Sequence, residues 1–330
     1  METFGDGRQA YLRTGGIAMA VALLGCLSIP VASQAADTVR IGLPTKTYWP
    51  TIVTEAARTM KLFEKEGLTA EPTVYRGGAE CFEAVAAGAA DVILDPPSLV
   101  ATGRNRGVMT KLVAGGSTES SGWHLMVGTG SKVQTLKDLD GKKLGITSAG
   151  SASDFLALWA VQHGKINVTR VPLGGGGLVP NLLSGNVDAV VLYSPLSYQL
   201  LSSKEARSLV NFATDMPANL TSGWIATDKI VAEQPQLVQR TLNALYGGLK
   251  YLRENRDFAV KLIAEVDEIP PDIAAMEYEN TILKLLPSGE MRPEWIDASL
   301  DLARLGGMKD MAPTDAIYTT QFKPMPAAAP

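Results

Sequence analysis

One hydrophobic pattern occurs twice along the chain, in segments 97 residues apart that run from Tyr75 to Ser98 and from Pro172 to Pro195. In each segment a glycine pair opens a short amphipathic helix, and another glycine follows the last helical turn. A continuous apolar run bounded by proline and serine comes next. Short runs of this kind are typical of strands that are buried on both faces of a parallel sheet.

Upstream of each segment the pattern predicts a further strand, helix and strand. The same order of elements therefore occurs twice, which indicates two α/β lobes of similar build, each a mostly parallel sheet flanked by helices. One long doubly wound sheet with an accidental match is the alternative. Asp91 and Asp188 occupy equivalent positions and are interpreted as turn or capping residues rather than as a catalytic pair. The other matched positions are Gly78 and Gly175, Val85 and Leu182, and Gly88 and Gly185.

The apolar run 222–227 is interpreted as a strand that returns the chain to the first lobe. Lobe 1 is therefore expected to comprise residues 37–122 and 225–330, and lobe 2 residues 123–224. The C-terminal third is rich in helical patterns and is expected to act as a scaffold. Its helices are predicted to begin at Pro235 and to continue over 258–266, 271–286 and 292–307.

Residues 1–35 have the pattern of a secretory signal peptide. Arg8 and Arg13 precede an uncharged stretch, and the small residues Ser33 and Ala35 lie where a signal peptidase reads the chain. The mature protein is therefore expected to begin at Ala36 or the residue after it, and to be exported to the periplasm.

Two other interpretations of the N-terminal segment stay open. The uncharged stretch is long enough to span a bilayer as an anchor. It also contains the sequence LLGC, which ends at Cys26 and would allow lipidation there, although the apolar residues after Cys26 fit a lipoprotein start poorly.

The net charge, the cysteine content and the absence of catalytic motifs limit the classes of function that the sequence allows. The formal net charge of −4 disfavours nucleic acid or an anionic membrane surface as a partner. After removal of the signal peptide Cys81 is the one cysteine left, which excludes an internal disulfide and indicates a small buried residue. The sequence contains no GxSxG, HExxH, GxxxxGK or CxxC motif, so neither an enzyme nor a cofactor or metal site is expected.

Candidate ligand contacts gather in loops at predicted strand ends, where open α/β sheets bind ligands. The aromatic residues Tyr48 and Trp49 are either ligand contacts or a hydrophobic lid over the following helix, and Lys46 is either a contact or a solvated charge. Ser151 and Ser153 are placed to cap a helix. The complete predicted set is Lys46, Thr47, Tyr48, Trp49, Gly78, Asp95, Ser98, Trp123, Ser151, Ser153, Gly176, Tyr193 and Ser194.

These loops are rich in Gly, Ser and Thr, and Lys46 and Arg76 are their only cations. Unpaired N–H groups at helix starts favour negative charge, so the site is expected to bind a compact anionic group. Asp95 would repel an anion unless it receives an ammonium group, as in a zwitterion. The alternative is that the glycines and serines only cap helices.

Several segments resemble the periplasmic solute-binding proteins of ABC importers in the nitrate, sulfonate and taurine group. They are AARTMKLFEKEGL, the GG…AVAAGAADV unit, LKDLDGKKLGI, the GSAS helix start, LLSGNVDAVVLYSP and EQPQLVQRTLNALYGGLKYLREN, which cover nearly all of residues 37–305. The chain departs from the family at Ser194, where many members have an acidic residue. It also lacks the cysteine-rich motif of the related pyrimidine-forming synthases.

The resemblance implies a type II periplasmic binding fold, with two lobes joined by crossing segments that map to 123–128 and 223–228. It also implies a ligand enclosed between the lobes and a permease in the inner membrane as partner. The expected function is the capture of a small anionic or zwitterionic solute by a monomeric binding protein. A periplasmic enzyme on the same fold and a ligand-sensing partner of a membrane receptor are the alternatives.

Overall fold

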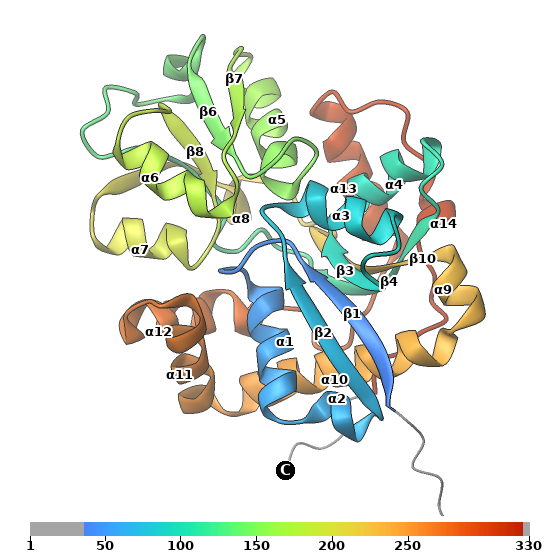
Figure 1. Cartoon of the computed structure of the whole chain (residues 1–330). Coiled ribbons are helices and arrows are strands. Elements are labelled where there is room, and N and C mark those ends of the chain that lie inside the picture. Colours follow the sequence, from blue (N-terminus) through green and yellow to red (C-terminus); the bar gives the residue numbers. More distant parts are fainter. Residues whose placement is uncertain (1–35, 326–330) are drawn as a thin grey trace, which may run out of the picture. The chain divides into compact units, whose positions relative to one another are not determined.

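The structure is a computed structural model that describes residues 36–325 (Figure 1). The predicted signal peptide and Cys26 lie outside the described residues. Within them the strands form two five-stranded sheets. Among the helices of this part of the chain, none combines the length and apolar character needed to cross a membrane.

The first sheet has the strand order β2-β1-β3-β10-β4. Strand β1 runs parallel to β2 and β3, whereas β10 is antiparallel to both of its neighbours. Its strands are β1 (Asp37–Leu43), β2 (Leu68–Val74), β3 (Val92–Asp95), β4 (Thr110–Ser117) and β10 (Ser222–Thr227).

The second sheet repeats this arrangement with the order β7-β6-β8-β5-β9. Strand β6 runs parallel to β7 and β8, and β5 is antiparallel to both of its neighbours. Its strands are β5 (His124–Gly128), β6 (Lys143–Ile146), β7 (Thr169–Pro172), β8 (Ala189–Leu192) and β9 (Ala206–Asn211). In both sheets four of the five strands point the same way, so the prediction of two mostly parallel α/β sheets is confirmed.

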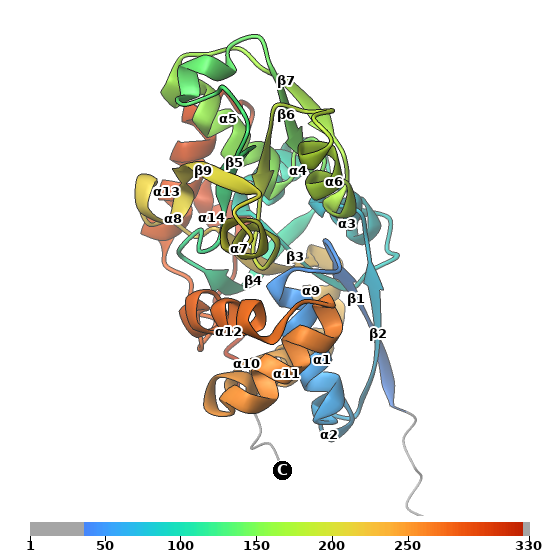
Figure 2. The ribbon, with the colours of Figure 1, turned by 90° about the vertical axis from the view of Figure 1, so that its left-hand side faces the viewer.

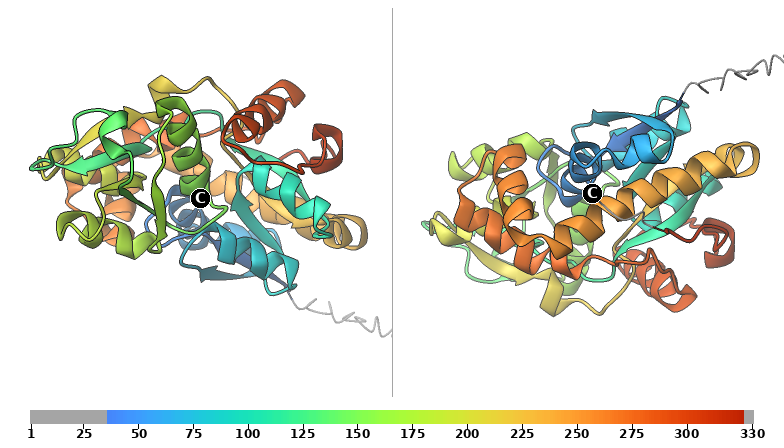
Figure 3. Two further views of the ribbon diagram at one scale, coloured as in Figure 1. Left: turned by 90° about the horizontal axis from the view of Figure 1, so that it is seen from above. Right: turned by 90° about the horizontal axis from the view of Figure 1, so that it is seen from below.

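Helices cover both faces of the first sheet. Alternate side chains of β3 point to opposite faces of the sheet, since Val92 and Leu94 pack on the side of α1 and α10 (Pro235–Glu254) while Ile93 packs on the side of α3 and α4. The long α10 lies beside α1 in the view from below (Figure 3). The helices up to β4 are α1 (Trp49–Thr59), α2 (Leu62–Lys65), α3 (Gly78–Ala86) and α4 (Pro97–Asn105).

The helices associated with the second sheet form one hydrophobic cluster with its strands. They are η1 (Leu136–Leu139), α5 (Ala152–Gly164), η2 (Gly175–Gly177), α6 (Leu178–Leu183), α7 (Leu196–Ser202) and α8 (Phe212–Asp215). Ser151 caps α5 as predicted, since its hydroxyl accepts a hydrogen bond from the Asp154 N–H.

The C-terminal helices contact elements of both sheets. Helix α13 packs against α4 and α5, and α12 lies beside α7 (Figure 2). These helices are α9 (Asp228–Glu233), α10 (Pro235–Glu254), α11 (Arg256–Asp267), α12 (Pro271–Asn280), η3 (Ile282–Lys284), α13 (Pro293–Leu305) and α14 (Thr314–Ile317). The helix predicted over 271–286 therefore ends earlier, at Asn280.

The internal repeat of the sequence is a structural repeat. Gly88 and Gly185 follow the last turns of α3 and α6 with φ values of 71° and 74°, a backbone region in which glycine has no steric penalty. Asp91 accepts the backbone N–H of Arg40 at 2.8 Å, and Asp188 accepts that of Lys143 at 2.9 Å. The two aspartates therefore hold the start of the strand that follows them, β3 or β8, to the neighbouring parallel strand, β1 or β6, rather than capping a helix.

The predicted crossing segments 123–128 and 223–228 are wrong. Most of each segment is a strand inside one sheet, namely β5 in the second sheet and β10 in the first. Residues 118–123 and 216–221 connect the sheets instead. A strand pairs with neighbours along its whole length, so it belongs to the rigid part of a sheet and the irregular residues before it are freer to bend.

Candidate functional site

A small cavity lies where the strand ends of the two sheets meet. Its volume is about 30 Å³, which is room for one or two water molecules. The first sheet and its loops contribute eight lining residues and the second sheet and its loops six, in agreement with the rule that open α/β sheets bind ligands at the carboxyl ends of their strands. The lining residues are Pro44, Thr45, Tyr48, Gly78, Leu94, Asp95, Pro96, Ser222, and Trp123, Thr147, Ser151, Ala152, Ser153, Tyr193.

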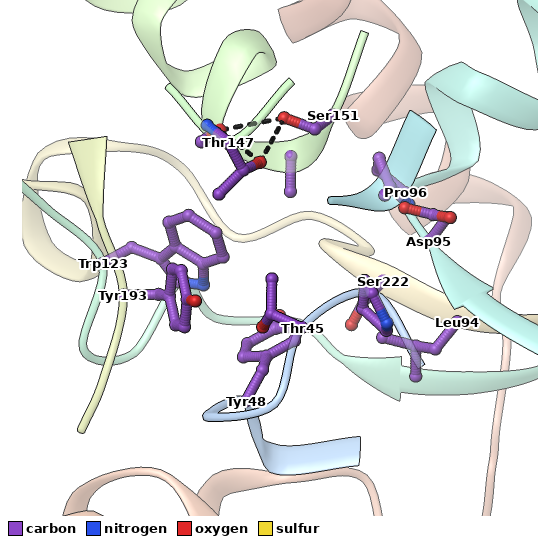
Figure 4. Close-up of a pocket in the computed structure, with 14 residues that line it drawn as sticks. Thr45, Tyr48, Leu94, Asp95, Pro96, Trp123, Thr147, Ser151, Tyr193 and Ser222 are labelled. Carbon is purple, nitrogen blue, oxygen red and sulfur yellow. Dashed lines mark hydrogen bonds between the residues drawn. The ribbon is translucent and has the colours of Figure 1, made fainter. Parts of the chain in front are cut away.

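Three hydroxyl groups from the second sheet's side form a closed triangle (Figure 4). Thr147 follows β6, and its Oγ1 lies 2.9 Å from the Oγ of Ser151 and 3.0 Å from that of Ser153. The two serine oxygens are 2.8 Å apart, and Ser153 also accepts the Thr147 N–H at 2.9 Å. This network fixes the start of α5 at the cavity wall, where the positive end of the helix dipole is directed.

Three aromatic rings form another wall. The ring of Tyr48 lies 5.7 Å from that of Trp123 and 5.4 Å from that of Tyr193, both in edge-to-face geometry. Trp123 and Tyr193 are 5.2 Å apart. Aromatic pairs at these distances pack favourably, so the wall is held in place before any solute arrives.

One buried carboxyl group completes the cavity. Asp95 at the end of β3 is 3% exposed, and its Oδ2 has no hydrogen-bond partner among the described residues. Burial raises the pKa of Asp95 well above its ordinary value, because the charged form loses its hydration. A side chain on Gly78 would collide with this group, since a Cβ there would lie 2.2 Å from Asp95 Oδ1.

Other buried polar atoms at the cavity also lack partners within residues 36–325. They are Thr45 Oγ1, Ser222 Oγ and the hydroxyl of Tyr193. A buried hydroxyl without a partner costs about 1–3 kcal/mol, and most such groups in folded proteins are satisfied. A polar ligand or water in the cavity would supply the missing hydrogen bonds.

Two equivalent glycine turns close the cavity, Gly77–Gly78 before α3 and Gly174–Gly175 before α6. The Gly175 N–H donates to the Arg76 carbonyl at 2.9 Å, and the Ala79 N–H donates to Ser148 Oγ at 3.3 Å. The contacts are reciprocal, because the first turn touches Ser148 after β6 and the second turn touches Arg76 after β2. A Cβ at Gly77 would lie 2.6 Å from Ser148 Oγ, and one at Gly175 2.7 Å from Thr45 Cγ2.

The structure brings seven of the thirteen predicted site residues to the cavity. They are Tyr48, Gly78, Asp95, Trp123, Ser151, Ser153 and Tyr193. Trp49 is turned away from it and packs in the core of the first sheet, with its ring edge-on to Trp224 at 6.2 Å. The two members of the aromatic pair are therefore placed differently: Tyr48 lines the cavity, where its role as a ligand contact stays a prediction, and Trp49 belongs to the core.

The remaining five predicted residues lie outside the cavity lining. Lys46 is exposed and forms an ion pair with Glu268 at 2.5 Å. Ser194 is buried and shares a hydrogen bond of 2.9 Å with Thr281. Ser98 is buried in α4 and Gly176 is exposed, and Thr47 is absent from the cavity lining as well.

Sequence reasoning missed the hydroxyl residues directly at strand ends. Thr45 follows β1, Thr147 follows β6, and Ser222 begins β10. A signal was available for the two threonines, since each comes one or two residues after a buried strand, β1 or β6. The same rule that selected Tyr48 would have selected them.

The charges around the site are unevenly distributed. The cavity lining contains no Lys, Arg or His, so Asp95 is its one group that can carry a full charge near neutral pH. Arg76 stands at the glycine turn, but its guanidinium is paired with Glu80 and is exposed. Within residues 36–325 no group of three or more His, Cys, Asp or Glu side chains is gathered as a metal site would require.

Comparison with known proteins gives one family and several relatives. A protein-family model described as NMT1/THI5 like matches residues 54–259. A protein of Brucella abortus named only as a binding protein is 27% identical over 305 residues, which cover 89% of this chain and 90% of that protein. A protein of Bacillus subtilis named for the binding of aliphatic sulfonates is 26% identical over 223 residues, or 66% of each chain.

Solved structures share the fold at low sequence identity. The alkanesulfonate-binding protein SsuA from Xanthomonas axonopodis pv. citri, bound to MOPS, superposes with a TM-score of 0.73 at 18% identity, covering 87% of this chain and 100% of that one. The periplasmic aliphatic sulphonate binding protein SsuA from Escherichia coli gives 0.70 at 19% identity, covering 88% and 94%. The desulfurization enzyme DSZB gives 0.56 at 16% identity, covering 82% and 92%. The predicted type II periplasmic binding fold is confirmed, and this fold carries both binding proteins and an enzyme.

Proposed function

The chain belongs to the NMT1/THI5-like family, and from that premise we propose that it is the extracytoplasmic solute-binding component of an ABC importer. It captures a small organic solute in the cavity between the two sheets and delivers it to a permease in the inner membrane. The protein is exported through its N-terminal segment and works as a monomer.

The observation that carries this proposal is the set of unpartnered polar atoms around a preformed aromatic wall. The ligand pockets of proteins are mostly apolar concavities with a few placed polar groups. Here Tyr48, Trp123 and Tyr193 supply the apolar surface, and the hydroxyl groups of Thr45 and Ser222 supply hydrogen bonds that the described residues leave unused.

We propose that the solute is anionic or zwitterionic. Several relatives are named for sulfonates, and the start of α5 offers an anion the positive end of a helix dipole and ordered hydroxyl groups at Ser151 and Ser153. The two cations of the predicted binding loops, Lys46 and Arg76, are already paired with carboxylates. Helix N–H groups rather than a dedicated arginine therefore hold the anionic group.

Solute entry requires the two sheets to part. Ligand pockets usually measure about 300–1,000 Å³, so a cavity of about 30 Å³ is a closed state that admits no organic solute from solution. In this state one hydrogen bond runs from the segment at each glycine turn to the opposite side of the cavity, from Gly175 N–H to the Arg76 carbonyl and from Ala79 N–H to Ser148 Oγ. Residues 118–123 and 216–221 are the proposed hinges.

Binding rather than catalysis is favoured by the state of the one cysteine in the described residues. Cys81 is buried in α3, and burial raises the pKa of its thiol well above the ordinary value. A thiol in this state is a poor nucleophile, because the thiolate is the reactive form. The alternative on this fold, an enzyme, would consume its solute, whereas a binding protein returns it unchanged.

A thermal-shift screen of the chain from Ala36 onward tests the proposal. The compounds are alkanesulfonates, aminosulfonates, nitrate, short carboxylates, amino acids and pyrimidines, followed by mass spectrometry of each hit after prolonged incubation. At least one class is expected to raise the melting temperature and to be recovered intact. No shift with any class, or conversion of the hit, would contradict the proposed function.

Export and oligomeric state have tests of their own. N-terminal sequencing of protein from the periplasm is expected to show a start at Ala36 or Asp37. If sequencing instead finds a blocked, lipid-modified Cys26, the protein is anchored by a lipid and the expected cleavage before Ala36 or Asp37 is wrong. Sedimentation of the purified mature chain is expected to give the mass of a monomer.

A further inference from the structure

We infer that the solute carries a protonated nitrogen and that Asp95 is the residue that pairs with it. The inference rests on the proposed function and specifies the chemistry at one end of the same cavity. Asp95 lies at the side of the cavity away from Trp123 and Tyr193 (Figure 4), so the nitrogen and the aromatic contacts belong to different parts of the solute.

The first support is the isolation of this carboxyl group. Asp95 is 3% exposed and lines the cavity, and its Oδ2 has no partner among residues 36–325. A buried ionised carboxylate is stable only when it is paired or fully hydrogen-bonded. Since the lining contains no Lys, Arg or His, a cation that pairs with the ionised form of Asp95 would have to come from outside this lining, as part of the solute.

The second support is the space made for the carboxyl group. Gly78 leaves Asp95 room that any side chain would fill, because a Cβ there would lie 2.2 Å from Oδ1. Ser222 stands next to Gly223, the strand partner of Asp95, and its unpartnered Oγ is a second acceptor for an N–H group. A protonated amine has several N–H donors, which two acceptors of this kind can satisfy together.

The titratable groups that face Asp95 come from two elements, Tyr48 before α1 and Cys81 in α3. Neither is cationic, and both stay neutral near pH 7, so neither compensates a carboxylate. The carboxyl group of the empty protein therefore keeps its proton to a higher pH than usual. When the amine binds, the carboxyl proton passes to the solvent and the nitrogen keeps its own.

A rival arrangement is chemically reasonable and makes opposite predictions. A neutral Asp95 could donate its O–H to an oxygen of an anionic solute. Affinity for that anion would then fall as pH rises, and Asp95→Asn, which keeps a hydrogen-bond donor, would retain binding. In the inferred arrangement affinity rises with pH, and Asp95→Asn loses the charge that holds the nitrogen.

The experiment uses pairs of probes that differ only in an ammonium or a hydroxyl group. They are taurine and isethionate, β-alanine and 3-hydroxypropionate, and the 5-aminomethyl and 5-hydroxymethyl forms of a methylpyrimidine. Calorimetric titration of the mature chain is expected to show one amine bound at least about 30-fold more tightly than its hydroxyl partner. Asp95→Asn is expected to remove that preference, and titration in two buffers of different ionisation enthalpy should show a proton released.

The control is Asp267→Asn, the same substitution at another buried carboxyl group without hydrogen-bond partners, outside the cavity lining. It should leave the amine preference unchanged, while the melting temperatures of both variants show that they are folded. A hydroxyl probe that binds as well as its amine partner, or an Asp95→Asn variant that keeps the preference, would overturn the inference. If the thermal-shift screen finds a solute without a basic nitrogen, this inference fails and the proposed function stands. If no solute of any class binds, both fail.

Discussion

Asp95 is the last residue of β3 in the first sheet. Tyr193 directly follows β8, the equivalent strand of the second sheet, at nearly the same place in the repeat. Both strands are buried and both follow a helix that begins at a glycine pair. An aspartate holds β3 to β1 in the first sheet, and another holds β8 to β6 in the second. The side chains that reach the cavity nevertheless differ in kind, a carboxyl group from one side and a phenol from the other.

The comparison distinguishes the residues that build the cavity from the residues that we propose select the solute. The features shared by the two sheets, which are strand order, glycine turns and aspartate braces, create two similar rims that meet. The features that differ give the cavity a carboxyl end and a hydroxyl end. A duplicated scaffold can therefore supply a symmetric enclosure, while single residues at strand ends give it an orientation for an asymmetric solute.

The largest expected effect comes from Gly78→Ala, at the first glycine turn. The new Cβ would be 2.2 Å from Asp95 Oδ1, so either the carboxyl group or the start of α3 must shift. Solute binding should be lost, and overpacking of this kind costs up to about 3 kcal/mol of stability. Calorimetry and urea unfolding measure the two effects. Retention of solute affinity would show that Asp95 is not held against this turn.

Glu277 sharpens the comparison, because it lies in a C-terminal helix that touches the second sheet's α7. It is fully buried, and burial raises its pKa to about 7, partly opposed by the hydroxyls of Ser194 and Thr281. Below about pH 4.5 the group is protonated in both the folded and the unfolded chain. Between about pH 4.5 and 7 the unfolded chain gives up this proton while the folded chain keeps it, so this contribution to stability falls progressively and is lost once the pH passes about 7.

Burial likewise raises the pKa of Asp267 to about 8, with the Glu277 charge adding to the shift, so the loss extends to about that pH. Glu277→Gln should therefore flatten the decline between pH 4.5 and 8 and stabilise the protein at pH 8 by on the order of 2–3 kcal/mol. Urea unfolding across this pH range is the measurement. A pH profile that matches that of the unsubstituted protein would contradict the assignment.

Substitutions at two adjacent glycines, Gly175→Ala and Gly176→Ala, test whether the second glycine turn holds the closed state. A Cβ at Gly175 would lie 2.6 Å from the Tyr193 hydroxyl, whereas one at Gly176 would meet nothing within 4 Å. Gly175→Ala should cost about 2 kcal/mol and shift the solution ensemble towards an open state. Gly176→Ala is the matched control and should do neither. Small-angle scattering of the two variants distinguishes them, and equal radii of gyration would count against a closing role for Gly175.

The smallest expected effect concerns the two aspartate braces. Asp91 has 9% of its side chain exposed and is paired with Arg40, while Asp188 is 38% exposed and 3.6 Å from Lys142. Asp91→Asn should therefore cost about 1–2 kcal/mol, and Asp188→Asn less than about 1 kcal/mol. Thermal unfolding of the two variants compares them directly. Equal losses would mean that the backbone hydrogen bonds alone determine the effect.

Local sequence patterns predicted the architecture well. Glycine pairs, apolar runs of four residues and the serine cap at Ser151 are signals that depend on neighbouring residues, and each produced the expected element. The rule that ligands meet the carboxyl ends of strands placed Asp95 and Tyr193 at the cavity. Applied to the first residues of the loops after β1 and β6, it would also have found Thr45 and Thr147.

The remaining site residues depend on contacts that no local pattern contains. Tyr48 has extended backbone just before α1 and Trp49 is the first helical residue, so no regular spacing relates their side chains. The packing of Trp49 against Trp224 is a long-range contact that the local sequence does not contain. Lys46 meets Glu268, and Ser194 meets Thr281, across more than 80 residues of sequence. The segments that connect the two sheets, 118–123 and 216–221, were missed because an apolar strand and an apolar crossing segment have the same composition.

The central claim is that one solute is held between strand ends of both sheets, with its nitrogen at Asp95. A crystal structure of the mature protein with the solute identified by the screen tests it most directly. The account predicts ligand density in this cavity, a basic nitrogen within hydrogen-bond distance of Asp95, and contacts to Trp123 or Tyr193 from the second sheet. Ligand density elsewhere on the chain, or an anionic group placed against Asp95, would contradict it.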